Sequence, residues 1–377
     1  MMTTNSRTGI YIHIPYCIRK CAYCDFLSFD SGLLREEYLD ALCFEIRERG
    51  DGRCADTVYI GGGTPTLLSP GEIYRILDAC SRSFVLSEGS EITIEANPGT
   101  VTGESLSGYL SAGINRISFG IQSFNDDVLR RLGRIHTADE AADSYSLARK
   151  AGFDNISMDL MFAVPGLSMD IWKQTLSRAV SMDPEHISFY SLQIEEGTPF
   201  YRMYENGTIT ETDEETDRNM YHYAAAFLAE SGYCHYEVSS CAKKGFESRH
   251  NLKYWSMADY TGAGLGASSF EEGVRTVNTS SIEEYINGCG RDGRRVHVNT
   301  AFDNASEFVF TGLRRLAGIS LDEFREFTGN DFFDVFPESR KKIEEWVNRG
   351  FAYFDDGVFR LTLKGIDIQN RILMEFV

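Results

Sequence analysis

Six short apolar runs recur along the first half of the chain, and each is followed by a longer segment with helical spacing. Alternating strand and helix patterns predict a parallel α/β sheet or barrel with right-handed crossovers. The runs occupy residues 9–15, 56–62, 91–98, 114–122, 154–166 and 186–194.

Several of these runs alternate apolar with polar residues, whereas strands buried on both faces of a parallel sheet normally read as continuous Val, Ile and Leu. In the third run, Ile92 and Ile94 alternate with Thr93 and Glu95. Helices would cover the apolar face, so the polar face would line an interior in which buried polar groups need partners. An occupied, polar-lined chamber meets this need. An antiparallel sheet with one wet face is the alternative.

The pattern of strand and helix signals changes twice in the second half of the chain. Residues 200–245 contain an acidic helix in which Thr212 and Glu215 are spaced as a capping box. After about residue 300 the strand and helix alternation gives way to a different pattern. We therefore expect three parts: residues 1–235 as the α/β part, 236–300 as a connecting segment, and 301–377 as a small C-terminal domain.

The C-terminal part predicts helices followed by a hairpin, an order typical of a winged-helix-like module. It carries 10 Lys and Arg against 14 Asp and Glu, so we interpret it as a packing or lid domain and not as a DNA-binding one. The local signals are Ser320 and Glu323 as a capping box, residues 340–350 as a helix closed by Gly350, and a turn at Asp356 and Gly357.

The net charge of −19 over 377 residues indicates an acidic surface. Nucleic-acid affinity rests largely on clustered Lys and Arg, so a phosphate-backbone partner is disfavoured, and an anionic membrane surface is disfavoured for the same reason. The chain has no run of about 18 apolar residues, and its first ten residues lack the apolar core of a signal peptide. We expect a cytoplasmic protein with no integral membrane segment and with unpaired cysteines.

Three cysteines stand close together after the first apolar run. Cys17, Cys21 and Cys24 form a C-x3-C-x2-C motif. A structural zinc ion needs four ligands, so this set would have to recruit another residue such as His13. Three buried, inert cysteines are a further alternative. A [4Fe-4S] cluster held by three thiolates leaves one iron open, so three thiols without a fourth favour such a cluster.

A glycine triplet at residues 61–63 follows the second apolar run, at the carboxyl end of an expected strand. Barrels and open α/β sheets bind their ligands at that end. Glycine lets the backbone approach a ligand closely, and Thr64 and Pro65 then fix the turn. A simple turn is the alternative, but the cysteine motif after the preceding strand favours a site.

The cysteine motif followed by G-G-G-T-P resembles the radical S-adenosylmethionine (SAM) superfamily. The resemblance implies a partial (β/α)6 TIM-like barrel with a smaller α+β, winged-helix-like C-terminal domain. It implies that the three cysteines hold a [4Fe-4S] cluster whose open iron is bound by the amino and carboxylate groups of SAM. An electron passed through the cluster would then cleave SAM to a radical that abstracts hydrogen.

Over its whole length the chain is similar to the oxygen-independent coproporphyrinogen oxidase branch, through the segments IEANPG, GIQSF, RIH and MDLMFAVPG. Glu95 and Asp159 are suited to accept ribose hydroxyls or an ammonium group, and Arg134 to hold a carboxylate. A satisfied buried polar network is the alternative for such residues. The contacts implied are Tyr11, Gly62 and Glu95 for the SAM on the cluster, and Tyr23, Gly63, Thr64, Gln122, Arg134 and Asp159 for a second SAM.

Two features separate the chain from the decarboxylating oxidase. That enzyme has a longer amino-terminal extension and a further cysteine where this chain has Phe26, and here an H-N-x-x-Y-W motif begins at His250. Both features resemble the heme chaperone branch. Imidazole is a usual axial ligand of heme iron, and Tyr254 and Trp255 offer an aromatic wall, so His250 is the candidate heme ligand. A packed, hydrogen-bonded histidine is the alternative.

The resemblance implies a protein that binds a [4Fe-4S] cluster, SAM and heme and delivers heme to apoproteins. It also implies that the protein interacts with an electron donor and can form a homodimer. The first alternative is a radical enzyme of porphyrin biosynthesis that decarboxylates a porphyrinogen, although Phe26 argues against coproporphyrinogen dehydrogenase activity. The second is a structural metal protein. The sequence leaves open whether the chain is an enzyme.

Overall fold

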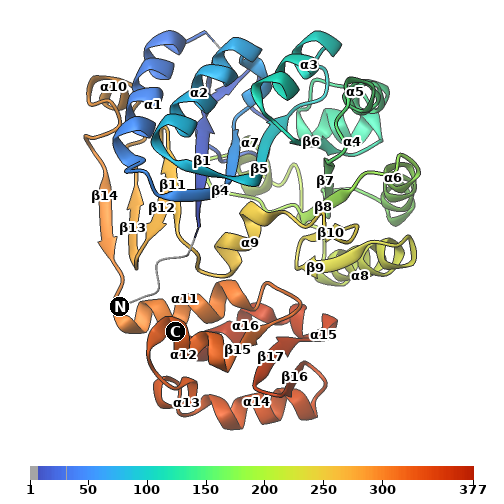
Figure 1. Cartoon of the computed structure of the whole chain (residues 1–377). Helices are drawn as coiled ribbons and strands as arrows, with labels where there is room; N and C mark the ends of the chain where they lie inside the picture. The colour runs from blue at the N-terminus through green and yellow to red at the C-terminus, as the bar shows by residue number, and fades with distance from the viewer. Residues whose placement is uncertain (1–6, 31) are drawn as a thin grey trace.

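The computed structural model describes residues 7–30 and 32–377, and its main body is a twelve-stranded sheet with helices on its outer side (Figure 1). Seven neighbouring strands run parallel, which confirms the parallel α/β prediction and rules out the antiparallel alternative for this part of the sheet. In sheet order they are β11 (Tyr260–Ala263), β1 (Thr8–Ile14), β4 (Cys54–Gly62), β5 (Val85–Ala96), β6 (Arg116–Gln122), β7 (Ile156–Phe162) and β8 (His186–Ser191).

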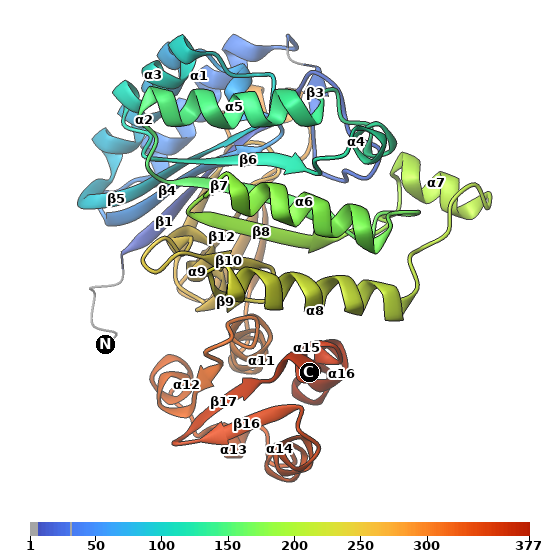
Figure 2. The same ribbon diagram turned by 90° about the vertical axis from the view of Figure 1, so that its right-hand side faces the viewer.

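The six predicted strands are β1, β4, β5, β6, β7 and β8, and helices connect them as crossovers. Figure 2 shows α5, α6 and α8 running beside β6, β7 and β8 on the outer side of the sheet. The helices of this part are α1 (Arg35–Arg49), α2 (Pro70–Ser83), α3 (Gly103–Ala112), α4 (Asp126–Leu132), α5 (Ala138–Ala151), α6 (Met169–Ser181), α7 (Pro199–Glu205) and α8 (Glu214–Glu230).

The acidic helix α8 begins one residue later than the capping-box spacing predicted. Asp213 is its N-cap and accepts a hydrogen bond from the backbone N–H of Thr216 at 2.8 Å. Thr212 instead donates its hydroxyl to the carbonyl of Ala163 at 2.8 Å, which ties the helix entry to the end of β7. The Thr212 cap was therefore wrong, because aspartate is a better N-cap than threonine and the threonine hydroxyl is used in a tertiary contact.

The polar residues of the parallel strands hydrogen-bond to one another inside the barrel, as the alternating pattern predicted. Tyr59 on β4 donates to Glu95 on β5 at 2.7 Å, and Ser118 on β6 lies 3.2 Å from a carboxylate oxygen of Asp159 on β7. The apolar residues of the same strands are buried beneath the helices; Ile117 on β6 has no exposed surface. Helices therefore cover the outer face of the sheet, and the inner face is polar.

The segment described from sequence as a connection is built into the sheet at both edges. The parallel pairing of β11 with β1 was not predicted, because the four residues of β11 form too short a run to read as a strand. Residues 234–298 supply β9 (Cys234–Glu237), β10 (Ser240–Ala242), α9 (Arg249–Trp255), β12 (Ser268–Glu271), β13 (Val274–Val277), α10 (Ile282–Asn287) and β14 (Arg295–Val298).

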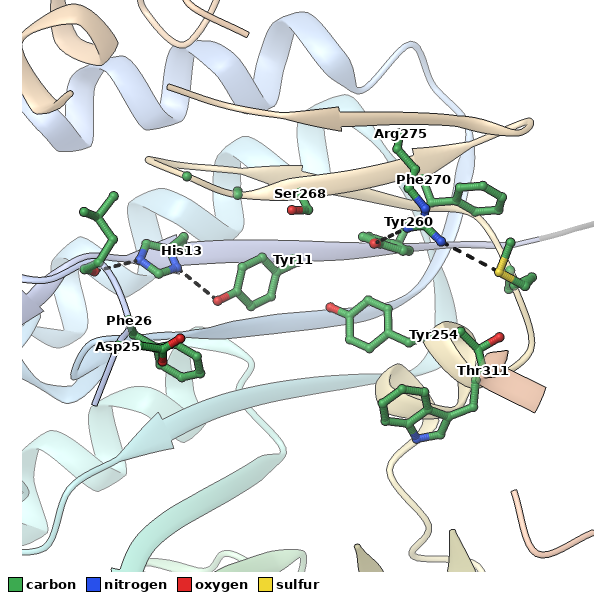
Figure 3. A pocket seen from close by; sticks show the side chains of 16 residues that line it. Tyr11, His13, Asp25, Phe26, Tyr254, Tyr260, Ser268, Phe270, Arg275 and Thr311 are labelled. Carbon is green, nitrogen blue, oxygen red and sulfur yellow. Dashed lines mark hydrogen bonds between the residues drawn. The ribbon is translucent and has the colours of Figure 1, made fainter. Parts of the chain in front are cut away.

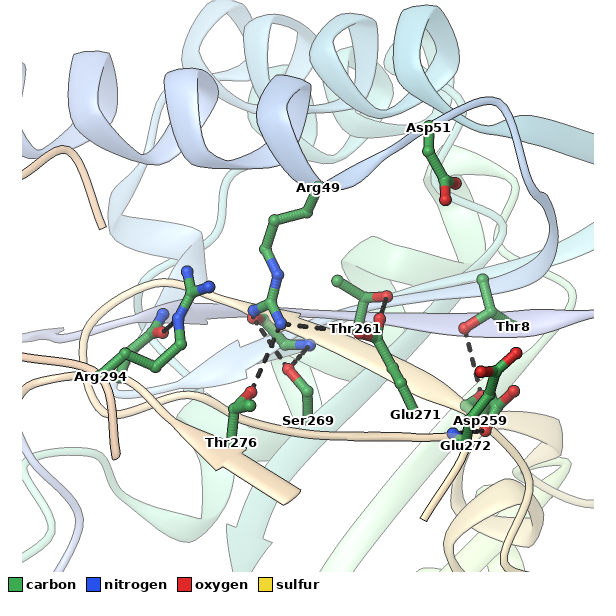
Figure 4. A network of polar contacts seen from close by, with 12 residues as sticks. Thr8, Arg49, Asp51, Asp259, Thr261, Ser269, Glu271, Glu272, Thr276 and Arg294 are labelled. Carbon is green, nitrogen blue, oxygen red and sulfur yellow. Dashed lines mark hydrogen bonds and ion pairs between the residues drawn. The ribbon is translucent and has the colours of Figure 1, made fainter. Parts of the chain in front are cut away.

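A buried polar network fixes the antiparallel edge strands to α1 (Figure 4). Arg49 at the end of α1 donates to the carbonyl of Gly262 on β11 and lies 3.4 Å from the hydroxyl of Thr276 on β13. Glu45, one turn earlier, accepts from the backbone N–H of Gly264 at 2.9 Å and pairs with Arg49 at 3.5 Å. Charge-assisted hydrogen bonds of this kind hold the extra strands against the barrel.

The C-terminal domain has the predicted order of helices followed by a hairpin. Ser320 caps α12, and Gly350 follows α14 in a left-handed conformation with φ of 75°. The hairpin turns at Asp356 and Gly357, both with positive φ, as the sequence predicted. The elements are α11 (Ala301–Gly312), β15 (Ile319–Ser320), α12 (Leu321–Thr328), α13 (Phe332–Val335), α14 (Ser339–Asn348), β16 (Ala352–Asp355), β17 (Val358–Leu361), α15 (Leu363–Ile366) and α16 (Gln369–Leu373).

Figure 1 shows this domain below the barrel, with α11 directed toward α9. Across the junction, Arg314 lies 4.4 Å above the ring of Trp255, and His222 on α8 contacts Asp367 at 2.9 Å. The two parts therefore meet through specific polar and aromatic contacts. Within residues 7–30 and 32–377, no helix has the length and apolar character needed to cross a membrane.

Candidate functional site

The three motif cysteines lie on one loop between β1 and α1, which we call the cysteine loop (residues 15–28). Cys17 ends the short strand β2 (Tyr16–Cys17), which pairs with β3 (Phe29–Asp30). Cys21 and Cys24 follow in a turn closed by a 3.3 Å backbone hydrogen bond between them. All three cysteines are partly exposed. The loop therefore presents three thiols from one short segment, beside the carboxyl end of β4.

Two side chains donate hydrogen bonds to these sulfurs. The Thr64 hydroxyl lies 3.6 Å from Cys17 Sγ, and Arg134 Nη1 lies 3.5 Å from Cys21 Sγ. Asn97 joins the two donors, because its Nδ2 donates to Thr64 Oγ1 at 2.8 Å and its Oδ1 accepts from Arg134 Nη2 at 2.6 Å. A continuous polar chain thus connects the first cysteine to the second. Hydrogen bonds to ligand sulfurs tune the potential of a bound cluster.

Two thiols of the loop, those of Cys17 and Cys24, favour their neutral form. Desolvation raises the pKa of Cys17 and raises that of Cys24 to about 11. In the part of the chain that the structure describes, no three His, Cys, Asp or Glu side chains gather as ligands of a single metal ion. His13 hydrogen-bonds through one ring nitrogen to the Tyr11 hydroxyl at 3.0 Å and through the other to the Leu27 carbonyl at 3.3 Å. Its ring is therefore engaged elsewhere and offers no fourth ligand for zinc.

The glycine triplet brings the end of β4 into close contact with the cysteine loop. Gly62 has φ of 110°, and a Cβ there would lie 2.5 Å from the ring of His13. A Cβ at Gly63 would lie 2.6 Å from the carbonyl of Tyr16, and the Gly63 N–H donates to Ile14 at 2.8 Å. Gly62 is thus required for packing against β1 and Gly63 for packing against the loop, in addition to any contact with a ligand.

Glu95 lies on the inner face of β5 and keeps part of its surface accessible. It accepts hydrogen bonds from the Tyr59 hydroxyl at 2.7 Å and the Gly62 backbone N–H at 3.0 Å. Desolvation raises its pKa to about 7, and the carboxylate of Asp159 adds to the rise. A carboxylate that titrates near neutral pH is a common feature of functional sites.

Arg116 is a buried cation on the same inner face. Its side chain is only 2% exposed, and its Nε has no hydrogen-bond partner among the described residues. Desolvation raises the pKa of Asp159 as it does that of Glu95, and the positive charge of Arg116 opposes the rise in both. The positive charge of Arg116 thus favours the ionised form of two carboxylates on the inner face of the barrel.

Gln122, Arg134 and Tyr23 meet near the cysteine loop. Gln122 ends β6 with φ of 64°, at a shift in the register between β6 and β7. Bulges and positive φ at a non-glycine residue are often found next to functional sites. Gln122 and Arg134 both approach the same side of Gly120. Burial raises the pKa of Tyr23, and Arg134 opposes this rise. The structure therefore brings Tyr23 and Gln122 of the second predicted group close to Arg134.

His250 lies at the opposite end of the barrel from the cysteine loop and has no exposed surface. Its Nδ1 lies 2.8 Å from the Thr57 hydroxyl, and its Nε2 lies 2.8 Å from the Tyr254 hydroxyl. Burial lowers its pKa to about 3, and Lys253 contributes to this lowering. In this structure both ring nitrogens have hydrogen-bond partners, so His250 could bind an iron only if one of these hydrogen bonds broke. The motif alone did not reveal these partners.

A cavity of about 520 Å³ runs from the cysteine loop to the C-terminal domain (Figure 3). We call it the junction cavity. Its lining comes from β1, the cysteine loop, α9, β11 to β13 and α11, and six of the sixteen lining residues are Tyr, Phe or Trp. Arg275 lies at one side, where it contacts Tyr260 and Met257. The aromatic residues are Tyr11, Phe26, Tyr254, Trp255, Tyr260 and Phe270.

Sequence reasoning missed Asn97 and Arg116 as members of the site. Asn97 stood in the IEANPG segment at the end of an apolar run, which was a usable signal. Arg116 stands on the polar side of the fourth run, which was also a signal, but it was given no role because an arginine at the start of a strand is ordinarily exposed. The contribution of Tyr254 was seen only as an aromatic wall, because its hydrogen bond to His250 depends on the helical geometry of α9.

Comparisons with known proteins agree with this arrangement. Residues 11–179 match the radical SAM superfamily, and residues 300–368 match the HemN C-terminal domain. The heme chaperone HemW of Bacillus subtilis is 37% identical over 376 residues, covering 97% of this chain and 98% of that protein. The chain belongs to the heme chaperone HemW family. Its counterpart from Haemophilus influenzae is 37% identical over 384 residues, covering 98% of this chain and 97% of that protein.

A solved structure shows the same fold. Coproporphyrinogen III oxidase (HemN) from Escherichia coli, described as a radical SAM enzyme, superposes with a TM-score of 0.85 over 100% of this chain and 91% of that one. The sequence identity is 22%, so the likeness concerns the fold. The resemblance to the radical SAM superfamily and to its heme chaperone branch is confirmed, and so is the predicted fold class.

Proposed function

We propose that this protein binds heme and transfers it to heme-accepting apoproteins, with a [4Fe-4S] cluster and SAM bound at the cysteine loop. One observation carries the proposal: relatives named heme chaperone HemW are similar to this chain from end to end. The chain also has the cysteine motif and the H-N-x-x-Y-W helix together. We place this activity in the cytoplasm, as the sequence predicts.

The cysteine loop suits a [4Fe-4S] cluster with three protein ligands, and we assign Cys17, Cys21 and Cys24 to it. Three partly exposed thiols lie on one loop, and Thr64 and Arg134 already donate to two of the sulfurs. Such donors are the usual surroundings of ligand sulfurs. When bound with SAM, a cluster of this kind supplies one-electron reductive cleavage of the SAM sulfonium.

The SAM contacts are proposed for residues on and around the cysteine loop and on the inner face of the barrel. Glu95, accessible in part and held by Tyr59, is suited to accept a hydrogen bond from a ribose hydroxyl or an ammonium group. Arg134 is suited to bind a carboxylate. An electron donor is required for any reductive step. The full proposed set is Tyr11, Gly62 and Glu95 for one SAM, and Tyr23, Gly63, Thr64, Gln122, Arg134 and Asp159 for a second.

Decarboxylation of a porphyrinogen is the second candidate, because the chain shares its whole fold with HemN. The residue two positions after the third cysteine argues against it. Phe26 there is 58% exposed and lines the junction cavity, so an apolar ring stands where the oxidase has a further thiol. We therefore favour heme binding and transfer over decarboxylation of a porphyrinogen.

Two assays on one anaerobic, cluster-reconstituted sample test the proposal. In the first, the protein is titrated with heme and then mixed with an apo-cytochrome, and we expect stoichiometric binding followed by transfer. In the second, reduced protein with SAM is given coproporphyrinogen III, and we expect no turnover. Steady formation of protoporphyrinogen would reject a purely carrier function, and failure to bind heme would reject the chaperone function itself.

A further inference from the structure

We propose that the junction cavity receives the heme and that the phenolic oxygen of Tyr254, supported by His250, binds its iron. This inference rests on the proposed function and names the site and the ligand that heme would use. Sequence reasoning placed the iron on His250 itself. The geometry of α9 assigns the two residues different tasks.

The junction cavity has the size and lining expected for a flat aromatic ligand. Its volume of about 520 Å³ lies within the range of small-molecule sites, and such sites are mainly apolar with a few placed polar groups. Arg275 supplies one of these polar groups, because it lines the cavity beside its ion pair with Glu307. A guanidinium group binds carboxylates, and heme carries carboxylates at its rim.

The helix α9 sets Tyr254 between the cavity and His250. Residues four apart are neighbours on one face of a helix, so the side chains at 250 and 254 meet. The rings are 5.1 Å apart in an edge-on arrangement, and the hydroxyl lies 2.8 Å from Nε2. Tyr254 lines the cavity, whereas His250 is fully buried behind it. An iron in the cavity would therefore meet the tyrosine oxygen first.

Tyrosine is an established axial ligand of heme iron, and it binds as the phenolate. His250 can stay hydrogen-bonded on both sides when Tyr254 loses its proton, because its Nδ1 faces the Thr57 hydroxyl, which can donate or accept. When ferric iron binds, the O–H bond of Tyr254 breaks and an Fe–O bond forms. The imidazole then donates from Nε2 to the phenolate and accepts the Thr57 hydroxyl at Nδ1. One proton leaves to solvent, and no electron is transferred.

The barrel contains a second set of the same three groups, which serves as a matched control. His186 lies 2.9 Å from the Ser157 hydroxyl and 2.8 Å from the Tyr236 hydroxyl. The Tyr236 hydroxyl also accepts the backbone N–H of Ser248 at 3.2 Å. Of these two tyrosines, only Tyr254 lines the junction cavity as the structure describes it. Removing either hydroxyl breaks an equivalent hydrogen bond to a buried histidine, but only one removal should affect the iron.

The test compares the reconstituted wild type with Tyr254→Phe, Tyr236→Phe and His250→Ala, each titrated with ferric heme and examined by resonance Raman spectroscopy. We expect iron-tyrosinate bands in the wild type and in Tyr236→Phe. Tyr254→Phe should lose the bands and about tenfold or more in affinity, whereas His250→Ala should keep the bands and bind more weakly. Metal-free protoporphyrin should bind Tyr254→Phe as it binds the wild type, which shows that the cavity is intact.

Other results would overturn the assignment of Tyr254 as the iron ligand. Absence of tyrosinate bands from the wild type overturns the ligand assignment even if a variant fails to fold. Unchanged heme affinity and spectrum in Tyr254→Phe overturn it as well, and loss of an imidazole-ligated spectrum only in His250→Ala would return the iron to His250. If the wild type binds no heme, the proposed function fails and not merely the choice of ligand.

Discussion

The hydroxyl of Thr57 lies 2.8 Å from Nδ1 of His250, and this contact ties α9 to the inner face of β4. With its other nitrogen on Tyr254, the imidazole has a partner on each side and no exposed surface. Such a histidine closes one end of the barrel, and it must stay uncharged, because its surroundings penalise a buried positive charge.

His250 should therefore make stability depend on pH. Its pKa is about 3 in the folded protein and near 6.5 in the unfolded chain, so only the unfolded chain takes up the proton between these values. The contribution to stability is complete above pH 6.5 and declines as the pH falls toward 3. We expect His250→Gln to reduce the slope of unfolding free energy against pH by up to about 1.4 kcal/mol per pH unit, measured by urea unfolding from pH 7 to pH 5. Equal slopes in the two proteins would contradict this.

Glu95 should control SAM binding near neutral pH. Its raised pKa of about 7 means that the folded protein holds a proton between about pH 4.5 and 7 that the unfolded chain has lost, so its contribution to stability decreases as pH rises through that window. The ionised form is the one that accepts hydrogen bonds from SAM. We expect SAM affinity to rise about tenfold from pH 6 to pH 8, by calorimetry under anaerobic conditions. Glu95→Gln should bind weakly and without this pH dependence; the same pH profile in the variant would assign the titration to another group.

Asn97 should set the reduction potential of the cluster through its two neighbours. Asn97→Ala removes the link between Thr64 and Arg134, so the donors to the two sulfurs lose their fixed positions. We expect the cluster still to assemble, but with a potential lower by about 60 mV, in a redox titration followed by electron paramagnetic resonance. Asn206→Ala, at an exposed turn, serves as the control. An unaltered potential in Asn97→Ala would show that the polar chain has no influence on the cluster.

Gly62 should tolerate no side chain. With φ of 110° and a Cβ only 2.5 Å from the ring of His13, Gly62→Ala combines backbone strain with a clash against β1. We expect a loss of about 1 to 3 kcal/mol in stability and a lower yield of reconstituted cluster. Gly103→Ala is the matched control, because its Cβ would meet nothing within 4 Å. Thermal melting and iron content measure both effects. If the two variants had equal melting temperatures and equal iron content, Gly62 would have no special packing role.

The strands could be predicted from the sequence because each apolar run carried its own signal, from Ile10 in β1 to Ile187 in β8. The edges of the sheet could not, because β11 has four residues and depends on its pairing with β1. Sequence reasoning was limited in the same way at the site. The spacing of the cysteines was enough to predict an iron–sulfur site, whereas the orientation of His250 depends on Thr57, which lies 193 residues away in the sequence. Long-range pairing of polar groups leaves no local pattern.

The open iron site is tested most directly by electron paramagnetic resonance of the reduced, anaerobically reconstituted protein before and after SAM is added. We expect a [4Fe-4S] signal whose g values change on addition of SAM, because SAM becomes a ligand of the iron that Cys17, Cys21 and Cys24 leave free. A triple Cys→Ala variant should give no signal. A cluster signal that ignores SAM, or that persists in the triple variant, would contradict the assignment.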